Sequence, residues 1–282
     1  MKKLCSSLII AFGIILSTSP VYASNQSIVV DGIAINSDAK PEVKNNRTMV
    51  PLRIISENLG AKVEWKKTEV NITKNKMKLS LNTNDSIALK NGEKVQLDAK
   101  PYLKNNRIYV PIRFIAETFQ SKVNYDKGTV RIDTAPFTID GVAVKAFQQE
   151  FHMIMGGVVQ QIRGNAYEEA LYRLIEENKG KNIEEPANYA WRINLDEAGA
   201  YYKNSQNEFL DEKGNSLKRF DIYSLQSAIP AGTLSEYPEI VVHDFNENQW
   251  YEFIGSARDS LEQLINTASM NGFLTIISNT VA

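Results

Sequence analysis

The chain has few residues that could perform catalysis, and its histidines set the narrowest limit. Only His152 and His243 occur among 282 residues. A serine triad and a zinc hydrolase both need histidine in a defined partnership. His152 lies in an apolar, methionine-containing stretch, Phe151 to Met155, without the spacing of metal ligands. We therefore expect it to be a packed or surface histidine.

His243 precedes a run of acidic and amide side chains that begins like a calcium-binding loop. The run Asp244-Phe245-Asn246-Glu247-Asn248 offers oxygen ligands at alternating positions. Gln249 then stands where the turn glycine of such a loop belongs, and Gly255 where its bidentate glutamate belongs. The segment is predicted to be a polar hairpin or loop. The sequence predicts no metal site and no cofactor.

Pairs of adjacent acids could support glycoside hydrolysis, which needs only two carboxyl groups flanking the scissile bond. The candidates are Glu168-Glu169, Glu184-Glu185 and Asp196-Glu197. Adjacent acids are also common on solvated surfaces. A secreted hydrolase that acts on cell-wall or carbohydrate substrates through these carboxylates is therefore an alternative function, and no individual catalytic residue is predicted.

Arg53 and Arg113 are the candidate site residues. Each follows a Val-Pro-Leu or Val-Pro-Ile sequence at the start of an expected helix, where a cation meets an unfavourable dipole. One interpretation is structural: the guanidinium binds a neighbouring carboxylate or loop carbonyl groups, with Asp38 and Asp98 as candidate partners. The other is an anion-binding site for a polymer of the cell envelope.

The first residues are typical of a secretory signal peptide. Lys2 and Lys3 precede an apolar stretch from Leu8 to Leu16, and small residues follow up to Ala23. The apolar stretch is short for a membrane span. We expect cleavage after Ala23. The protein is then predicted to be secreted or extracellular, to associate with the cell wall, and to have no membrane span after cleavage.

The remaining composition excludes several classes of protein. The single cysteine, Cys5, lies in the expected signal peptide, so we expect neither disulfides nor a thiol nucleophile. Removing Lys2 and Lys3 changes the net charge from 32 − 33 = −1 to 30 − 33 = −3. A nearly balanced charge gives no indication of nucleic-acid binding, which usually requires a clustered basic surface.

An internal repeat is the strongest pattern in the sequence. Shifting the chain by 60 residues aligns Asp38 to Val63 with Asp98 to Val123, with 15 identities in 26 positions. Asn45-Asn46 and Asn105-Asn106 predict tight hairpin turns, because asparagine tolerates positive φ. Pro51 and Pro111 fit the first position of a helix. Each copy is expected to form a hairpin, a short helix and a second hairpin.

These motifs resemble the N-terminal-like domain of copper amine oxidases. The resemblance rests on the Asp-Gly or Asn-Gly turn, the proline, Asn-Asn-Arg, Val-Pro-Leu/Ile-Arg, an amphipathic helix and an aromatic strand residue, Trp65 or Tyr125. It covers roughly Ser27 to Thr134 and implies a non-catalytic α+β module of exported bacterial proteins. The family's catalysis belongs to a separate, larger domain.

The chemistry suggested by the family name can be tested on the sequence. Copper amine oxidases need three copper-binding histidines and a tyrosine within Thr-x-x-Asn-Tyr-Asp/Glu. The segment from Ser121 to Asp126 is a near match, but serine replaces threonine, and Tyr125 is already the repeat partner of Trp65. Two histidines are too few for the copper site. We expect no amine oxidation.

The rest of the chain is predicted to be a β-rich domain with flanking helices. Helices are expected from Asn165, as an N-cap, to about Asn178, and near the end, where Ser256 and Asp259 form a plausible capping pair. The expected strands are Tyr189 to Leu195, Lys218 to Tyr223, Glu239 to Val242 and Phe273 to Ile277. Five aromatic residues are candidates for a core or for a ligand groove: Tyr201, Tyr202, Phe209, Phe220 and Tyr223.

The sequence thus predicts an α+β protein in three parts: a signal peptide (1–23), a tandem repeat domain (27–135) and a β-rich C-terminal domain (136–282). The expected function is a non-enzymatic, envelope-associated binding or scaffold protein. Its expected partner is a cell-wall polymer or another envelope protein.

Overall fold

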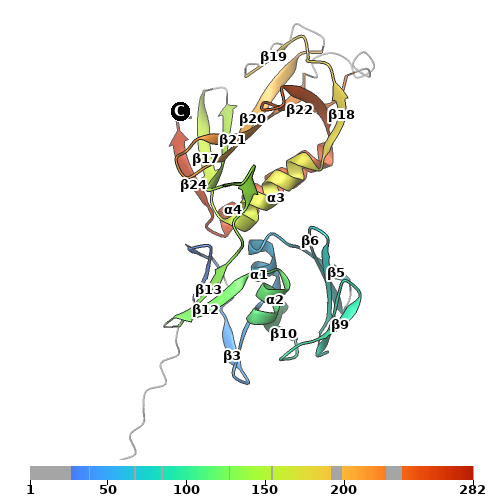
Figure 1. Cartoon of the computed structure of the whole chain (residues 1–282), viewed down its shortest axis with the longest axis vertical. Coiled ribbons are helices and arrows are strands. Elements are labelled where there is room, and N and C mark those ends of the chain that lie inside the picture. Colours follow the sequence, from blue (N-terminus) through green and yellow to red (C-terminus); the bar gives the residue numbers. More distant parts are fainter. Residues whose placement is uncertain are drawn as a thin grey trace, which may run out of the picture.

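The computed structural model describes residues 27–37, 39–66, 68–83, 85–126, 128–153, 155–191, 199–226 and 237–281. It shows a strand-rich protein with several sheets and helices packed between them (Figure 1). None of the helices in these ranges combines the length and apolar character needed to cross a membrane. The predicted signal peptide (1–23) lies outside the described residues.

Residues 27–133 contain short strands and two seven-residue helices, and several elements start 60 residues before a later element of the same type. The elements in chain order are β1 (Ser27–Val30), β2 (Ile33–Ala34), β3 (Glu42–Lys44), β4 (Arg47–Pro51), α1 (Leu52–Asn58), β5 (Lys62–Lys66), β6 (Glu69–Lys74), β7 (Met77–Asn82), β8 (Ile87–Lys90), β9 (Glu93–Gln96), β10 (Tyr102–Lys104), β11 (Arg107–Pro111), α2 (Ile112–Thr118), β12 (Lys122–Asp126) and β13 (Thr129–Asp133).

The two predicted asparagine turns are confirmed. Asn45 and Asn46 have φ values of 50° and 59°, and Asn105 and Asn106 have values of 49° and 60°. Two successive residues with positive φ match the right-handed twist of the flanking strands. Each turn therefore closes an antiparallel hairpin, β3–β4 in one case and β10–β11 in the other.

The two hairpins join into one four-stranded sheet with the order β10-β11-β4-β3. At its centre Val50 pairs with Val110, and both side chains are fully buried. Helices α1 and α2 pack against each other, and each contacts both β4 and β11. The prediction that Pro51 and Pro111 are the first helical residues was wrong by one position, because both end a strand with extended ψ values of 118° and 121°.

Two further sheets flank this centre. One has the order β12-β13-β1-β2, in which β1 and β13 are parallel, and the other has the order β5-β6-β7-β8-β9. Strand β7 lies between β6 and β8. Strands β6 and β8 run in the same direction, and two parallel strands cannot be joined by a tight turn. Strand β7, which is antiparallel to both, connects them in the sheet.

Residues 138–279 form a second set of sheets and two longer helices. The elements are β14 (Thr138–Ile139), β15 (Val142–Ala143), β16 (Ala146–Met153), β17 (Gly156–Ile162), α3 (Asn165–Glu176), β18 (Lys179–Ile183), β19 (Tyr189–Ala190), β20 (Tyr201–Leu210), β21 (Ser216–Leu225), β22 (Ile240–Asp244), β23 (Gln249–Phe253), α4 (Gly255–Met270) and β24 (Leu274–Asn279). Strands β14 and β15 pair with each other. The others form a nine-stranded sheet, β18-β23-β22-β21-β20-β16-β17-β24, with β19 paired to β20.

Most element predictions for this part are confirmed, with corrections at the helix ends. Helix α3 begins at Asn165 itself, whose side chain donates to the Thr134 carbonyl instead of capping the helix. Helix α4 begins at Gly255, so Ser256 lies inside it and forms no capping pair with Asp259. The hairpin β16–β17 was not predicted. Part of the strand predicted from Tyr189 to Leu195 lies outside the described residues.

Helices α3 and α4 lie on the side of the nine-stranded sheet that faces residues 27–133 (Figure 1). At this junction the Tyr167 hydroxyl donates to Asn58 Oδ1 at 2.9 Å, and the Asn36 N–H donates to the Asn271 carbonyl. Buried apolar residues from both parts, from Ile28 to Phe273, form one contiguous core. The junction is therefore a packed interface.

Candidate functional site

A cavity of about 480 Å³ opens where α1 meets the β10–β11 hairpin. We call it the Trp65 cleft. Helix α1 and the end of β4 provide one wall, β5 provides the indole, and the hairpin turn provides the other wall. The residues that line it are Pro51, Leu52, Arg53, Ile54, Trp65, Asn106, Arg107 and Ile108. Residues from the first copy of the 60-residue pattern and residues from the second copy thus line one cavity.

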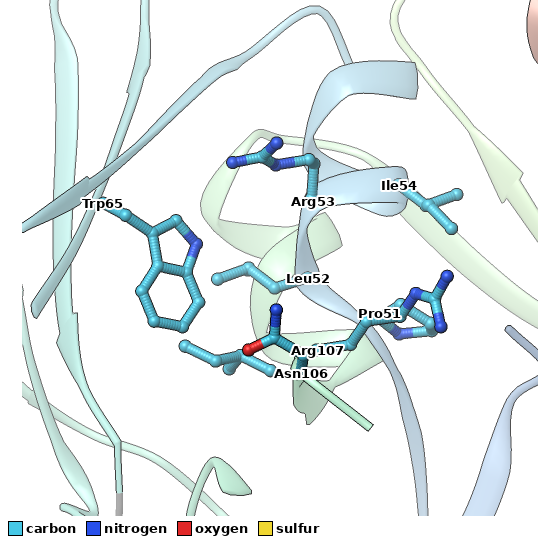
Figure 2. A pocket seen from close by; sticks show the side chains of 8 residues that line it. Pro51, Leu52, Arg53, Ile54, Trp65, Asn106 and Arg107 are labelled. Carbon is cyan, nitrogen blue, oxygen red and sulfur yellow. The ribbon is translucent and has the colours of Figure 1, made fainter. Parts of the chain in front are cut away.

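Trp65 gives the cleft its apolar surface. Its side chain is 42% exposed, although it lies in a strand next to a packed core. Figure 2 shows the indole directed toward Leu52, with Arg53 extending to the same side of the cavity. The faces of an aromatic ring carry partial negative charge and attract polarised C–H groups and cations. An exposed indole beside polar groups is therefore suited to binding a ligand.

Arg53 contributes a positive charge to the cleft, and the nearby carboxylate of Glu57 neutralises it only weakly. Its Nε lies 3.8 Å from Glu57 Oε1, and its side chain is 58% exposed. An exposed pair of this length contributes at most about 1 kcal/mol to stability. Burial raises the pKa of Glu57, whereas the charge of Arg53 lowers it and offsets part of the increase. The guanidinium keeps donors directed to solvent within the cleft.

Arg113 occupies the corresponding place on α2. Its Nε lies 3.9 Å from Glu117 Oε1, its side chain is 59% exposed, and its guanidinium carbon lies 5.8 Å from the centre of the Tyr125 ring. Asp98, one of the two candidate carboxylate partners of the arginines, accepts from Arg47 Nε at 2.5 Å. Asp38, the other predicted partner, lies outside the described residues.

The two histidines are packed against tryptophans. The His152 ring stacks on Trp191 with 4.1 Å between centroids, and its Nε2 lies 2.8 Å from Glu150 Oε1. His243 is buried and stacks on Trp250 with 4.5 Å between centroids. His243 lies in β22 of the β22–β23 hairpin, as the prediction of a polar hairpin implied.

The adjacent acids do not converge on one cleft within the described residues. Glu168 lines a cavity with Asp31 and Lys145, while Glu169 lines another and binds Arg173 at 2.9 Å. Glu185 accepts from the Tyr189 hydroxyl at 2.6 Å. The pair Asp196-Glu197 lies outside the described residues.

Glu168 is the most perturbed of these acids. It is 1% exposed, its Oε1 accepts from the Gly164 N–H at 3.2 Å, and its Oε2 is buried without a hydrogen-bond partner. Burial raises the pKa of the carboxyl to about 7, and the nearby Asp31 charge adds to the increase, against the Gly164 hydrogen bond. Such a pKa is typical of a general acid. The residue itself is almost fully buried in the wall of its cavity, and Oε2 is the buried oxygen without a partner.

Three carboxylates gather at the end of α3, where Glu176, Asp244 and Glu247 have ligand oxygens within 4.8 Å of one another. Two ammonium groups already compensate them. Asp244 Oδ2 lies 2.8 Å from Lys179 Nζ and 2.7 Å from Lys218 Nζ. Burial would raise the pKa of Asp244, but these hydrogen bonds lower it. The donor set therefore suits an internal ion-pair network better than a divalent cation.

The C-terminal aromatic residues separate into two groups. Phe209 and Phe220 are fully buried and pack around Tyr172. Tyr201 and Tyr223 belong to a smaller core cluster with Trp250, and the Tyr202 hydroxyl donates to the His152 carbonyl at 2.8 Å. Tyr202 lines a cavity that also contains Trp191.

The sequence identified Arg53 but missed the other residues of the Trp65 cleft. Trp65 was read as a strand aromatic, and Asn106 and Arg107 as parts of a turn. Their proximity depends on the pairing of β4 with β11, which places the second hairpin turn beside the first helix. The available signal in the sequence is the recurrence of an aromatic residue at positions 65 and 125.

Comparison with known proteins identifies one domain. Residues 29–134 match the family model of the copper amine oxidase N-terminal domain. Searches among curated proteins and among solved structures gave no match. The match includes all residues of the Trp65 cleft and ends one residue after β13.

Proposed function

Because residues 29–134 form a copper amine oxidase N-terminal domain, a non-catalytic type of domain, we propose that this protein is a non-enzymatic binding protein of the cell envelope. In this proposal the chain is exported by a signal peptide that ends at Ala23, and residues 27–135 form a tandem repeat domain that arose by duplication. Residues 136–282 form a second domain. The expected product of export begins at Ser24, which N-terminal sequencing would test.

The Trp65 cleft is the observation that carries the binding function. It combines an exposed indole, an amide and arginine side chains in one concave surface of about 480 Å³. The apolar C–H face of a sugar ring can pack on the indole, and amides satisfy hydroxyl groups. Guanidinium groups bind carboxylate or phosphate. The proposed ligand is therefore an acidic glycan of the envelope.

A binding experiment with matched charge variants tests this function. The probes are a uronic-acid polymer, a polyol-phosphate polymer and a neutral polysaccharide, each titrated with the chain from Ser24. Binding of at least one acidic polymer but not of the neutral one is expected. Trp65→Ala and Arg53→Gln should each weaken it at least about fivefold, about 1 kcal/mol, because each removes a direct contact.

Lys62→Gln provides the control, since Lys62 is 74% exposed and pairs with Glu64 at 2.8 Å on β5, outside the cleft. It removes the same charge as Arg53→Gln and should leave binding unchanged. Equal losses in the two variants would indicate non-specific attraction and contradict the cleft. Arg53→Lys should change the free energy of unfolding by less than about 0.5 kcal/mol. Shortening of the polymer during incubation would instead reveal the hydrolase alternative.

A further inference from the structure

We infer that the N-terminal domain carries a second binding cleft for the same acidic polymer, built from Arg113, Tyr125, Asn46 and Arg47. This inference rests on the proposed function of the Trp65 cleft. These four residues stand 60 positions from Arg53, Trp65, Asn106 and Arg107 respectively. We call them the Tyr125 cleft.

The strand pairing relates the two sets of residues by a local two-fold axis. Val50 pairs with Val110 at the centre, Pro51 with Tyr109 on one side and Met49 with Pro111 on the other. A shift of 60 positions converts Pro51 into Pro111 and Tyr109 into Met49, so it converts the pair Pro51–Tyr109 into the pair Pro111–Met49. An antiparallel pair with this register has its axis at the central pair. The axis therefore places the β3–β4 turn beside α2 in the same way as the β10–β11 turn lies beside α1. In agreement with this, α2 contacts β4 and α1 contacts β11.

The local geometry of the two sets agrees closely. Trp65 is 42% exposed and Tyr125 49%, so both rings face solvent. Asn106 and Asn46 have φ values of 60° and 59°. The arginine-to-glutamate distances are 3.8 Å and 3.9 Å, and the arginine side chains are 58% and 59% exposed. Each set presents an open aromatic ring, an amide turn and a guanidinium.

One difference makes the Tyr125 cleft the weaker one. Tyrosine offers a smaller ring than tryptophan for stacking. At the Tyr125 cleft Arg47 is held by Asp98 at 2.5 Å, so an anionic ligand there must compete with a carboxylate of the protein itself. This ion pair can be tested by mutation, because Asp98→Asn releases Arg47 and changes no residue that lines the Trp65 cleft.

The separation of the two clefts favours a polymer as the ligand. Each hairpin turn begins four residues from the central pair, in opposite directions along the strands. At about 3.3 Å per residue the turns lie roughly 25 Å apart. A short oligomer can therefore fill only one cleft, whereas a polymer can reach both. The linked second contact raises the effective concentration and strengthens polymer binding.

Calorimetric titration with a uronic-acid trimer, a polyol-phosphate trimer and the corresponding polymers tests the inference. Two trimers per chain are expected for the unmodified protein, and one for either Trp65→Ala or Tyr125→Ala. The double variant should bind none. Each single variant should lose at least about fivefold in polymer affinity. Asp98→Asn should tighten the weaker trimer site, a gain that a purely structural role would not produce.

The outcomes separate the two proposals. One trimer per chain, with no effect of Tyr125→Ala, would overturn the second cleft and leave the Trp65 cleft standing. Absence of binding to every acidic probe would overturn both. Because both aromatic side chains are exposed, the variants should melt within a few degrees of the parent. A Tyr125→Ala variant that melts normally and still binds two trimers would also exclude the site.

Discussion

At the scale of single residues, the pKa values of two adjacent glutamates near the start of α3 are shifted in opposite directions. Glu168 is buried with an unsatisfied oxygen, and its pKa is raised to about 7. Glu169 is partly buried, which raises its pKa, but hydrogen bonds from Arg173 and Asn75 and the charge of Lys74 leave it lowered overall. Side chains that differ by one position along a helix point about 100° apart, so their surroundings need not be similar.

Glu168→Gln should change how stability depends on pH. Below pH 4.5 the carboxyl is protonated in both the folded and the unfolded chain. As the pH rises from 4.5 to about 7, the unfolded chain releases this proton first, so the free energy of unfolding falls. The loss is complete above pH 7 and amounts to something on the order of 3 kcal/mol. Urea unfolding of Glu168→Gln should lack this decline.

Glu169→Gln is the matched control with the opposite sign. A lowered pKa stabilises the folded protein above pH 4.5, and this contribution disappears as the pH falls through the folded value. The variant should therefore lose stability mainly at neutral pH. A Glu168→Gln variant whose stability follows the same pH curve as the parent would contradict the assigned burial.

At the scale of elements, the ends of α1 and α2 show how the same geometry is reached with different residues. Gly60 has a φ of 75° after α1, and Gln120 adopts a φ of 59° after α2. Glycine adopts this region without strain, whereas other residues pay about 1 kcal/mol or more. Gly60 also faces a close neighbour, since a Cβ there would lie 2.9 Å from the Ala166 carbonyl oxygen.

Substitutions at these helix ends should shift stability in opposite directions. Gly60→Ala should lower the free energy of unfolding by more than about 1 kcal/mol through strain and the Ala166 contact. Gln120→Gly should raise it by up to about 1 kcal/mol. Gly92→Ala separates the two causes, because Gly92 has a φ of 88° but open space around it. Chemical denaturation should show a larger loss for Gly60→Ala than for Gly92→Ala.

At the scale of the whole molecule, the junction between the two proposed domains is continuous with their cores. Tyr167 is fully buried and donates to Asn58 at 2.9 Å, while the Asn271 amide donates to the Tyr167 hydroxyl at 3.2 Å. These contacts connect α1, α3 and the end of α4. A shared core couples the stability of the parts that contribute to it.

Residues 24–282 should therefore unfold in a single calorimetric transition. Tyr167→Phe should lower its midpoint and cost about 1–3 kcal/mol, because the buried Asn58 oxygen loses its donor. Tyr202→Phe removes one hydrogen bond within the C-terminal part and should have a smaller effect. Two resolved transitions in the unmodified protein would show that the domains unfold independently.

The local structure of the N-terminal domain was determined by its sequence. Pairs of asparagines at the hairpin turns specify positive φ, and apolar residues three and four positions apart specify the buried faces of α1 and α2. The family resemblance depended on these same local signals and was confirmed by the match to residues 29–134. Arg53 and Arg113 stood out because a cation is unexpected in a first helical turn.

Tertiary structure alone decided what these residues face. The side of α1 on which Trp65 meets Asn106 depends on β4 pairing with β11, and no local pattern encodes a partner 60 residues away. The same holds for Asp98, which pairs with Arg47, and for the burial of Glu168 between two parts of the chain. Turns and helix faces follow from local sterics and periodicity, whereas clefts and pKa values follow from long-range packing.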